Sequence, residues 1–421
     1  MTTDNNQMAE TNLATPLSPS VQMPAFAPSV FSPWQSIAFK ALDGWSEGHL
    51  TLIMPDRRVC SFGTQAPGLP DVTVTIHAPR VFRRLVLGGV LAFAESYMDG
   101  DWSCSDLTDL FRLFLANGAQ SRKVYNLGRL AQWSDRLRHF MNRNTKRGSR
   151  RNIAYHYDLG NDFYKAWLDA SMTYSSAYQT RAEEPLEEAQ ARKYERVLDL
   201  AGCKEGHSVL EIGCGWGGLA EHAARRGART HGVTLSREQL AYARARSVEH
   251  GFADKAKFEL CDYRDTSGQV DNIISIEMIE AVGHENWNRY FSVIRDRLKP
   301  GGSAVIQAIV IADDRYEDYK NGVDFIQRYI FPGGMLPSPS ALRNTIEEAG
   351  LSLVEEEYFG EDYAHTLAVW NKDFQKAWPS IAPLGYDERF RRMWEYYLTY
   401  CEAGFLAKSI DVGFFKIVKP A

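Results

Sequence analysis

The stretch VLEIGCGWGG at residues 209–218 decides the fold. Its first four residues are typical of a short buried strand, and glycines follow at Gly213, Gly215 and Gly218 before a helical stretch begins. Glycine lets the backbone adopt a positive φ and approach a ligand closely. The pattern predicts a ligand site at the carboxyl end of the first strand of an α/β sheet, although a glycine turn without a ligand would look the same.

The rest of the C-terminal part alternates in the same way. Short apolar runs are separated by helical stretches such as 237–250 and 287–298. This alternation is typical of a doubly wound, mostly parallel sheet. The expected strands span residues 208–212, 229–234, 257–260, 272–276, 303–309, 351–358 and 414–419, and the last two close the C-terminal edge.

Composition divides the chain into four segments. Residues 1–32 are rich in Ser, Thr, Pro and Asn and are expected to form a disordered tail. Residues 33–120 combine strand-like runs at 49–54 and 72–77 with a helical stretch that ends at 106–116, which predicts a small α+β domain. Residues 121–151 form a basic helical linker, and residues 152–421 hold the glycine loop and are expected to be the catalytic domain.

The basic segment 122–151 has a charge of its own. It holds ten Lys and Arg residues against one acid, a local charge of +9 in a chain of net charge −5, with apolar residues at roughly helical spacing. Such a helix is typical of an element that lies on an anionic membrane surface. A solvated linker helix that packs its apolar face on its own protein fits equally well. Nucleic acid is not expected, because aromatic stacking platforms are missing here.

The positions of the acidic residues distinguish between possible cofactors. A dinucleotide site usually has an acid about 20 residues after the glycines, but the strand at 229–234 ends in Thr-Leu-Ser. Instead, Glu211 precedes the first glycine and Asp262 follows the third strand. This arrangement resembles class I S-adenosylmethionine-dependent methyltransferases. The fold prediction is therefore a doubly wound, Rossmann-like methyltransferase sheet of the α/β class, preceded by the small α+β domain.

Four further segments resemble a particular family. They are YHYDLGNDFY at 155–164, TYSSAY at 173–178, EMIEAVGH at 277–284 and YIFPGGMLP at 329–337. With the glycine loop they resemble the cyclopropane-fatty-acyl-phospholipid synthases, from about residue 152 to the end. Before that the resemblance is weaker, although ESYMDG at 95–100 also has the family pattern.

The resemblance implies transfer of a methylene group from S-adenosylmethionine to a cis double bond of an unsaturated phospholipid, with a bound bicarbonate as the base. Glu280 and Tyr363 match residues that hold bicarbonate, and Glu280 becomes the base itself if no anion binds. Two positions depart from the common pattern, Ser176 and Gln307; both keep hydrogen-bonding groups, and as further candidate catalytic residues they are expected to lie at the anion and tune its binding. Cys401 matches a family cysteine sometimes proposed as catalytic, but its apolar helix favours a packing role. The residues expected to bind the cofactor are Tyr174, Ser175, Glu211, Gly213, Gly215, Gly217, Thr234, Leu235, Gln239, Asp262, Tyr263 and Arg264.

Other classes of function are compatible with part of this sequence pattern. A methyl- or methylene-branched product would need the same cofactor site, and so would methylation of a soluble small molecule. The six cysteines show no metal-ligand spacing, so no metal is expected. No apolar run is long enough to span a membrane. We expect a cytoplasmic protein, peripheral at the inner membrane face, with a small lipid-associated N-terminal domain and a homodimer as a possible assembly.

Overall fold

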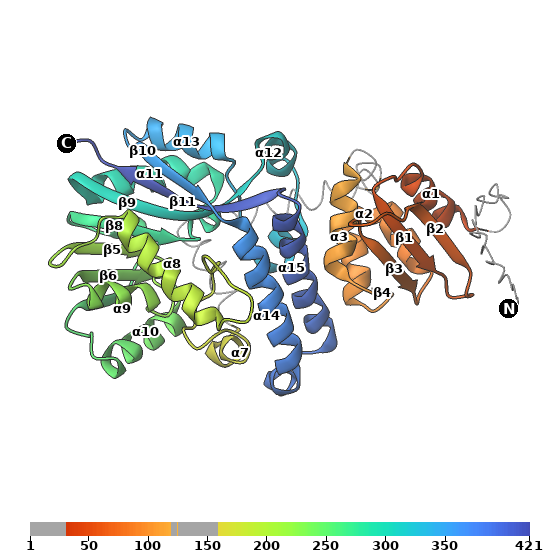
Figure 1. The fold of residues 1–421 in the computed structure, drawn as a ribbon, viewed down its shortest axis with the longest axis horizontal. Coiled ribbons are helices and arrows are strands. Elements are labelled where there is room, and N and C mark those ends of the chain that lie inside the picture. The colour runs from red at the N-terminus through yellow and green to blue at the C-terminus, as the bar shows by residue number, and fades with distance from the viewer. Residues whose placement is uncertain (1–30, 119–123, 125–158) are drawn as a thin grey trace, which may run out of the picture.

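The computed structural model describes residues 31–118, residue 124 and residues 159–421. Most of the predicted N-terminal tail, the basic segment 122–151 apart from residue 124, and the first residues of the motif at 155–164 lie outside the described residues. We call residues 31–118 the N-terminal unit and residues 159–421 the C-terminal unit (Figure 1).

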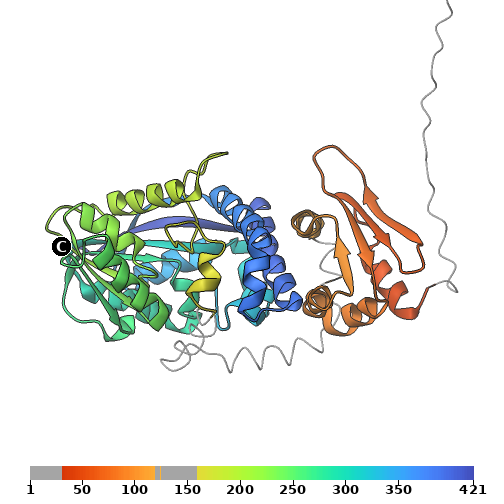
Figure 2. The same cartoon turned by 90° about the horizontal axis from the view of Figure 1, so that it is seen from below.

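The N-terminal unit is a small sheet covered by helices. Its elements are α1 (Pro33–Leu42), β1 (Gly48–Ile53), β2 (Val59–Thr64), β3 (Asp71–Ile76), α2 (Arg80–Met98), β4 (Trp102–Cys104) and α3 (Leu107–Ala116). Among the described residues, the four strands lie in the order β2-β1-β3-β4, with β1 and β3 parallel. Burial alternates along β1 and β3, because successive side chains of a strand point to opposite faces. The helices cover one face of this sheet (Figure 2).

The C-terminal unit is built on a larger sheet. Its strands are β5 (Ser208–Ile212), β6 (Arg229–Thr234), β7 (Ala256–Leu260), β8 (Val270–Ile276), β9 (Leu298–Ile311), β10 (Ser352–Tyr358) and β11 (Ile410–Val418). Its longer helices are α8 (Leu186–Leu200), α9 (Gly218–Arg225), α10 (Arg237–Glu249), α11 (Trp287–Arg297), α12 (Asp313–Lys320), α13 (Pro339–Glu348), α14 (Gly360–Ile381) and α15 (Glu388–Leu406); α7 (Asn161–Lys165) is a single short turn.

The seven described strands lie in the order β10-β11-β9-β8-β5-β6-β7. The pairs among β5 to β9 are parallel, whereas β11 runs antiparallel to both β9 and β10. Helices pack on both faces, so the predicted doubly wound α/β sheet is confirmed. In β5, Val209 joins a hydrophobic cluster with α8, while Leu210 and Ile212 join a second cluster with α11 on the opposite face.

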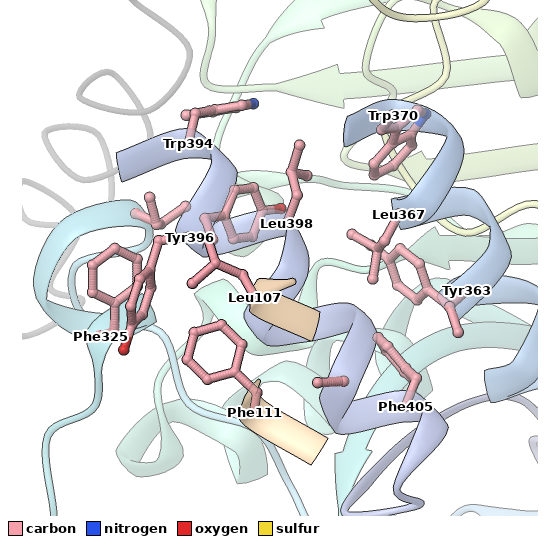
Figure 3. Packing of buried hydrophobic residues seen from close by; sticks show 14 of the residues in the cluster. Leu107, Phe111, Phe325, Tyr363, Leu367, Trp370, Trp394, Tyr396, Leu398 and Phe405 are labelled. Carbon is pink, nitrogen blue, oxygen red and sulfur yellow. The ribbon is translucent and has the colours of Figure 1, made fainter. Parts of the chain in front are cut away.

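Helix α15 joins the two units. It packs beside α14 and against α2 and α3 of the N-terminal unit. The Phe111 ring of α3 meets the Tyr396 ring of α15 edge to face, at 4.8 Å between centroids (Figure 3). Thr108 Oγ1 donates a hydrogen bond to Glu402 Oε2 at 3.0 Å. Apolar and polar contacts thus hold the N-terminal unit beside the carboxyl-end region of the large sheet.

No helix in the described part of the chain has both the length and the apolar character needed to cross a lipid bilayer.

Candidate active site

The glycine loop after β5 uses its glycines for different purposes. Gly213, Gly215 and Gly217 all have positive φ, at 84°, 50° and 86°. A Cβ at Gly213 would collide with Met278, and a Cβ at Gly217 would lie 3.2 Å from that of Ala243. A Cβ at Gly215 would meet nothing within 4 Å. Two glycines therefore permit close packing, while Gly215 leaves open space in front of the loop.

One cavity of about 990 Å³ lies in front of this loop. Of the twelve residues expected to bind the cofactor, Gly217 alone does not line it, because Gly217 caps α9 and packs on Ala243. The cavity continues from the loop past Tyr174 to Phe93 and Phe111 of the N-terminal unit. Side chains from both units therefore enclose the same space.

Glu211 is the acid that precedes the loop. It is 5% exposed, and burial raises the pKa of its carboxyl well above the usual range, with the charge of Arg246 opposing the shift. Its Oε2 is buried and has no hydrogen-bond partner among the described residues. A buried acceptor without a donor needs an explanation. The ammonium group of S-adenosylmethionine supplies three donors and fits this position.

The opposite end of the cofactor site is preorganised. Arg264 forms a two-pronged ion pair with Asp262, with distances of 2.8 Å from Nε to Oδ1 and 2.6 Å from Nη2 to Oδ2. Thr234 Oγ1 donates to Gln239 Oε1 at 3.0 Å. The Tyr263 hydroxyl is buried, lines the cavity and has no described partner. These groups suit the ribose and adenine of the cofactor.

A second glutamate, which the sequence analysis did not single out, lies at the centre of the site. Glu277 directly follows β8 and lines the cavity. Its Oε1 accepts hydrogen bonds from Ser176 N at 2.8 Å and from Gln307 Nε2 at 2.7 Å. Its Oε2 accepts from the Tyr363 hydroxyl at 2.7 Å. Three of the residues predicted to surround a bicarbonate thus converge on a carboxylate of the protein itself.

This finding changes the expected roles of Ser176 and Gln307. Neither residue lines the cavity. Ser176 uses its backbone N–H for Glu277, and its hydroxyl donates to Ala177 O at 2.8 Å. The serine side chain therefore does not point its hydroxyl at the reaction site, and Gln307 acts on the site through Glu277.

Lys193 of α8 was also missed. It is completely buried, and its Nζ lies 2.5 Å from Ser175 Oγ, to which it donates. Burial lowers the pKa of Lys193, with the charge of Glu277 opposing that shift most strongly. Burial likewise raises the pKa of Glu277, and Lys193 opposes that shift. The two residues are therefore an electrostatically coupled pair in the core.

Glu280 lies one turn beyond Glu277 and differs from it in charge state. Burial, and then the neighbouring charge of Glu277, raise the pKa of Glu280 to about 8. Its Oε1 accepts from Ile309 N at 2.6 Å, while its Oε2 has no partner among the described residues. Glu280 is consequently protonated at neutral pH, whereas Lys193 and three hydrogen-bond donors oppose the rise in the pKa of Glu277 that burial causes.

Cys401 lines the cavity, whereas most aromatic residues of segment 163–178 pack in the protein core. Cys401 lines the cavity, but burial raises the pKa of its thiol, so that it stays protonated and is a poor nucleophile. Phe163 and Trp167 do not line the cavity; they pack in an aromatic core with Trp394. Of this segment's aromatic residues, Tyr174 is the one that reaches the cavity.

The described residues contain no group of three metal-ligating side chains.

The fold and this cofactor site define an S-adenosylmethionine-dependent methyltransferase. Residues 144–415 match the family model of mycolic acid cyclopropane synthetase. The chain belongs to this family.

Relatives with curated functions include both ring-forming and methylating enzymes. The chain is 42% identical over 371 residues to the tuberculostearic acid methyltransferase UfaA1 of Mycobacterium tuberculosis, covering 85% of this chain and 86% of that protein. It is 36% identical over 359 residues to the cyclopropane-fatty-acyl-phospholipid synthase of Escherichia coli K12, covering 83% and 88%. The solved structure of mycolic acid cyclopropane synthase CmaA1, complexed with SAH and CTAB, matches with a TM-score of 0.60 at 28% identity, covering 64% of this chain and 98% of that one.

Proposed function

We propose that this protein transfers the methyl group of S-adenosylmethionine to a cis double bond in an acyl chain of an unsaturated phospholipid. The observation that carries the proposal is the single cavity that extends from the glycine loop to apolar side chains of the N-terminal unit. Its volume of about 990 Å³ is near the upper end of the range of about 300–1,000 Å³ for small-molecule sites. That space accommodates the cofactor together with part of an acyl chain.

The walls of this cavity suit the chemistry of an alkene. When a double bond attacks the sulfonium methyl group, the acyl chain is left with a positive charge. Water would trap that cation as an alcohol, so the site must exclude water. Tyr174, Phe331 and Tyr397 line the cavity, and aromatic faces are apolar yet attract cations.

The cation has two ways to lose a proton. In the first, a proton leaves the new methyl group and its C–H electrons close a cyclopropane ring. In the second, a hydride first moves onto the cationic carbon from the carbon that bears the methyl group. Proton loss from the methyl then gives a methylene branch. Either way the lipid gains one CH2, and a saturated methyl branch would additionally require a reductant.

We favour the branched product. Glu280 is protonated at neutral pH, and three hydrogen bonds fix the oxygens of Glu277 in place, so no base that can move toward the cation lies in the described part of the site. Slow proton removal gives the hydride time to move. The likeness to the tuberculostearic acid methyltransferase agrees with this outcome. Cyclopropane formation is the second candidate, favoured by the family model and by the likeness to the Escherichia coli synthase.

The test is incubation with vesicles of monounsaturated phosphatidylglycerol and S-adenosylmethionine carrying a ¹³C-labelled methyl group. Mass spectrometry should show acyl chains that have gained one labelled CH2. Ozone should cleave the labelled product at its new double bond if it is a methylene branch, whereas a cyclopropane would survive. Labelled lipid that resists ozone would select the second candidate, and absence of label from the lipid would refute acyl methylation.

Association with a membrane belongs to the same proposal. The basic segment 122–151 would hold the protein on an anionic lipid surface, at the cytoplasmic face of the inner membrane. A homodimer remains a prediction from the sequence.

A further inference from the structure

A carboxylate at the cavity wall and a buried ammonium group lie in the same part of the site. Glu277 lines the cavity, Lys193 is completely buried, and the charge of each acts on the pKa of the other. On the basis of the proposed acyl methylation, we propose that Glu277 is the proton acceptor of the reaction. Lys193 is its positioning counter-charge, and the enzyme needs no dissolved anion such as bicarbonate.

The hydrogen bonds around Glu277 give the first argument. Ser176 N, Gln307 Nε2 and the Tyr363 hydroxyl all donate to its two oxygens, at 2.7–2.8 Å. Tyr363 is one of the two residues expected to hold bicarbonate, and Ser176 and Gln307 lie behind Glu277 without lining the cavity. Glu277 therefore occupies the anion-binding groups that a dissolved base would use.

Charge gives the second argument. A lysine is almost never fully buried unless it is paired, and Lys193 has no solvent exposure. Glu277 and Asp169 are the anions that act on it, with Glu277 the stronger. Glu277 thereby has its counter-charge. A second anion beside Glu277 would face a like charge at close range, and Glu280 avoids that repulsion by staying protonated.

The backbone gives the third argument. Glu277 has φ of 49°, in the left-handed region that glycine adopts most readily. Its N–H donates to Gln307 O at 2.8 Å, so the residue is held from both its backbone and its side chain. Non-glycine residues in strained conformations cluster at active sites. A glutamate is thus kept at a position where the chain itself would favour glycine.

After methyl transfer the acyl chain carries one positive charge and Glu277 one negative charge. A proton passes from the new methyl carbon to a Glu277 oxygen. After the hydride shift the C–H electron pair becomes the π bond of the methylene branch, whereas without the shift it would close the cyclopropane ring. Glu277 is then neutral and returns the proton to water when the product leaves.

The test compares two variants at Glu277. Glu277→Gly removes the carboxylate, relieves the left-handed strain and leaves a space bordered by three donors. Glu277→Gln fills that space with an amide of the same shape. Both should bind S-adenosylmethionine in calorimetry but lose turnover by about 10²–10⁴-fold, the usual contribution of a general base. Added formate, acetate or bicarbonate should restore turnover to Glu277→Gly and not to Glu277→Gln.

The native enzyme supplies a measurement that does not depend on how a variant folds. Its lipid methylation should proceed at the same rate in carbon-dioxide-free buffer and in buffer with added bicarbonate. A native rate that falls when bicarbonate is removed would overturn the inference while leaving acyl methylation intact. Full turnover in Glu277→Gly, or failure of all three anions to rescue a folded, cofactor-binding Glu277→Gly, would overturn it as well. Absence of native lipid methylation would instead refute the proposed function.

Discussion

Replacing Lys193 with methionine should destabilise the protein much more than an ordinary substitution. Lys193 is fully buried in α8, and its charge acts on the buried carboxylate of Glu277. Methionine fills a similar volume but lacks the ammonium group, so Glu277 stays in the core without its counter-ion. Breaking a buried ion pair in direct contact costs about 3–5 kcal/mol, whereas a typical point substitution costs about 1 kcal/mol. Lys193 Nζ makes its close contact with Ser175 Oγ and acts on Glu277 through its charge. We therefore expect Lys193→Met to lower the free energy of unfolding by more than the typical amount, toward the lower end of the range for direct pairs.

A second substitution separates the pairing from the packing. Glu277→Gln alone keeps an oxygen acceptor for Ser176 and Gln307 but removes the charge that most strongly opposes the fall in the pKa of Lys193. The buried lysine must then stay charged without that partner or give up its proton, and either costs stability. The double variant Lys193→Met/Glu277→Gln has neither charge, and replacing a buried ion pair by neutral side chains is often close to neutral in stability. The double variant should therefore be more stable, by about 2 kcal/mol or more, than the sum of the single losses predicts.

The assay is urea unfolding at neutral pH, followed by the fluorescence of the ten tryptophans and by circular dichroism. The control is Asp169→Asn, alone and with Lys193→Met, because Asp169 is the weaker of the two anions that act on Lys193. The interaction free energy between Asp169 and Lys193, obtained from the double-mutant cycle, should be smaller than that between Glu277 and Lys193. Strictly additive losses for Lys193 and Glu277 would refute the pairing and remove the argument that Lys193 keeps Glu277 ionised.

Four further predictions concern the site and the membrane. Gly215→Val should abolish S-adenosylmethionine binding in calorimetry, because the valine side chain fills the open space in front of the loop. Gly215→Ala is the control for the effect of a side chain at the left-handed φ of 50°. Normal binding by the valine variant would show that the cofactor site lies elsewhere. Burial keeps Glu280 protonated up to its pKa of about 8, while in the unfolded chain it ionises near 4.5, so the folded state binds more protons and stability falls as pH rises between these values. The melting temperature of Glu280→Gln should fall less than that of the native protein as pH rises from 4.5 to about 8. An equal fall in both proteins would show that other groups cause the pH dependence. Cys401→Ser should keep turnover within a few-fold in the lipid assay, because the buried thiol stays protonated; a loss of orders of magnitude would restore a catalytic role. Reversing three basic charges in segment 122–151 should release the protein from anionic vesicles in sedimentation, each charge contributing about 1 kcal/mol at low salt, and unchanged sedimentation would contradict a membrane role.

The sequence predicted the large sheet well because its signals are local. The seven expected strands coincide with β5 to β11 to within a few residues, apart from the longer β9 (Leu298–Ile311), whose first residues are polar or small. In the N-terminal unit β2 (Val59–Thr64) was missed. Only Phe62 is buried in that edge strand, so its sequence lacks the alternation that marks a half-buried strand.

The cofactor site was predictable for the same reason, and its chemical centre was not. The glycine loop and the residues after β6 and β7 are recognised from short motifs. Glu277 receives its hydrogen bonds from Ser176 and Tyr363, which are 101 and 86 residues away in the chain. A lysine in a helix is ordinarily a surface residue, so nothing in the sequence predicted that Lys193 would be buried. The one available signal was the pair of glutamates three residues apart in EMIEAVGH, directly after a buried strand.

The hydrogen bonds that hold Glu277 also limit how it can act as a base. Its three donors oppose the rise in pKa that burial causes, and they fix the orientation of both oxygens. Held by its backbone at a φ of 49°, it also cannot follow the acyl chain as a dissolved anion could. A cation that waits for a fixed base has time for a hydride shift, and proton loss after the shift gives a branch where earlier loss gives a ring. The built-in anion and the branched product therefore have a common cause in the contacts of Glu277, whereas the cofactor loop is compatible with either product.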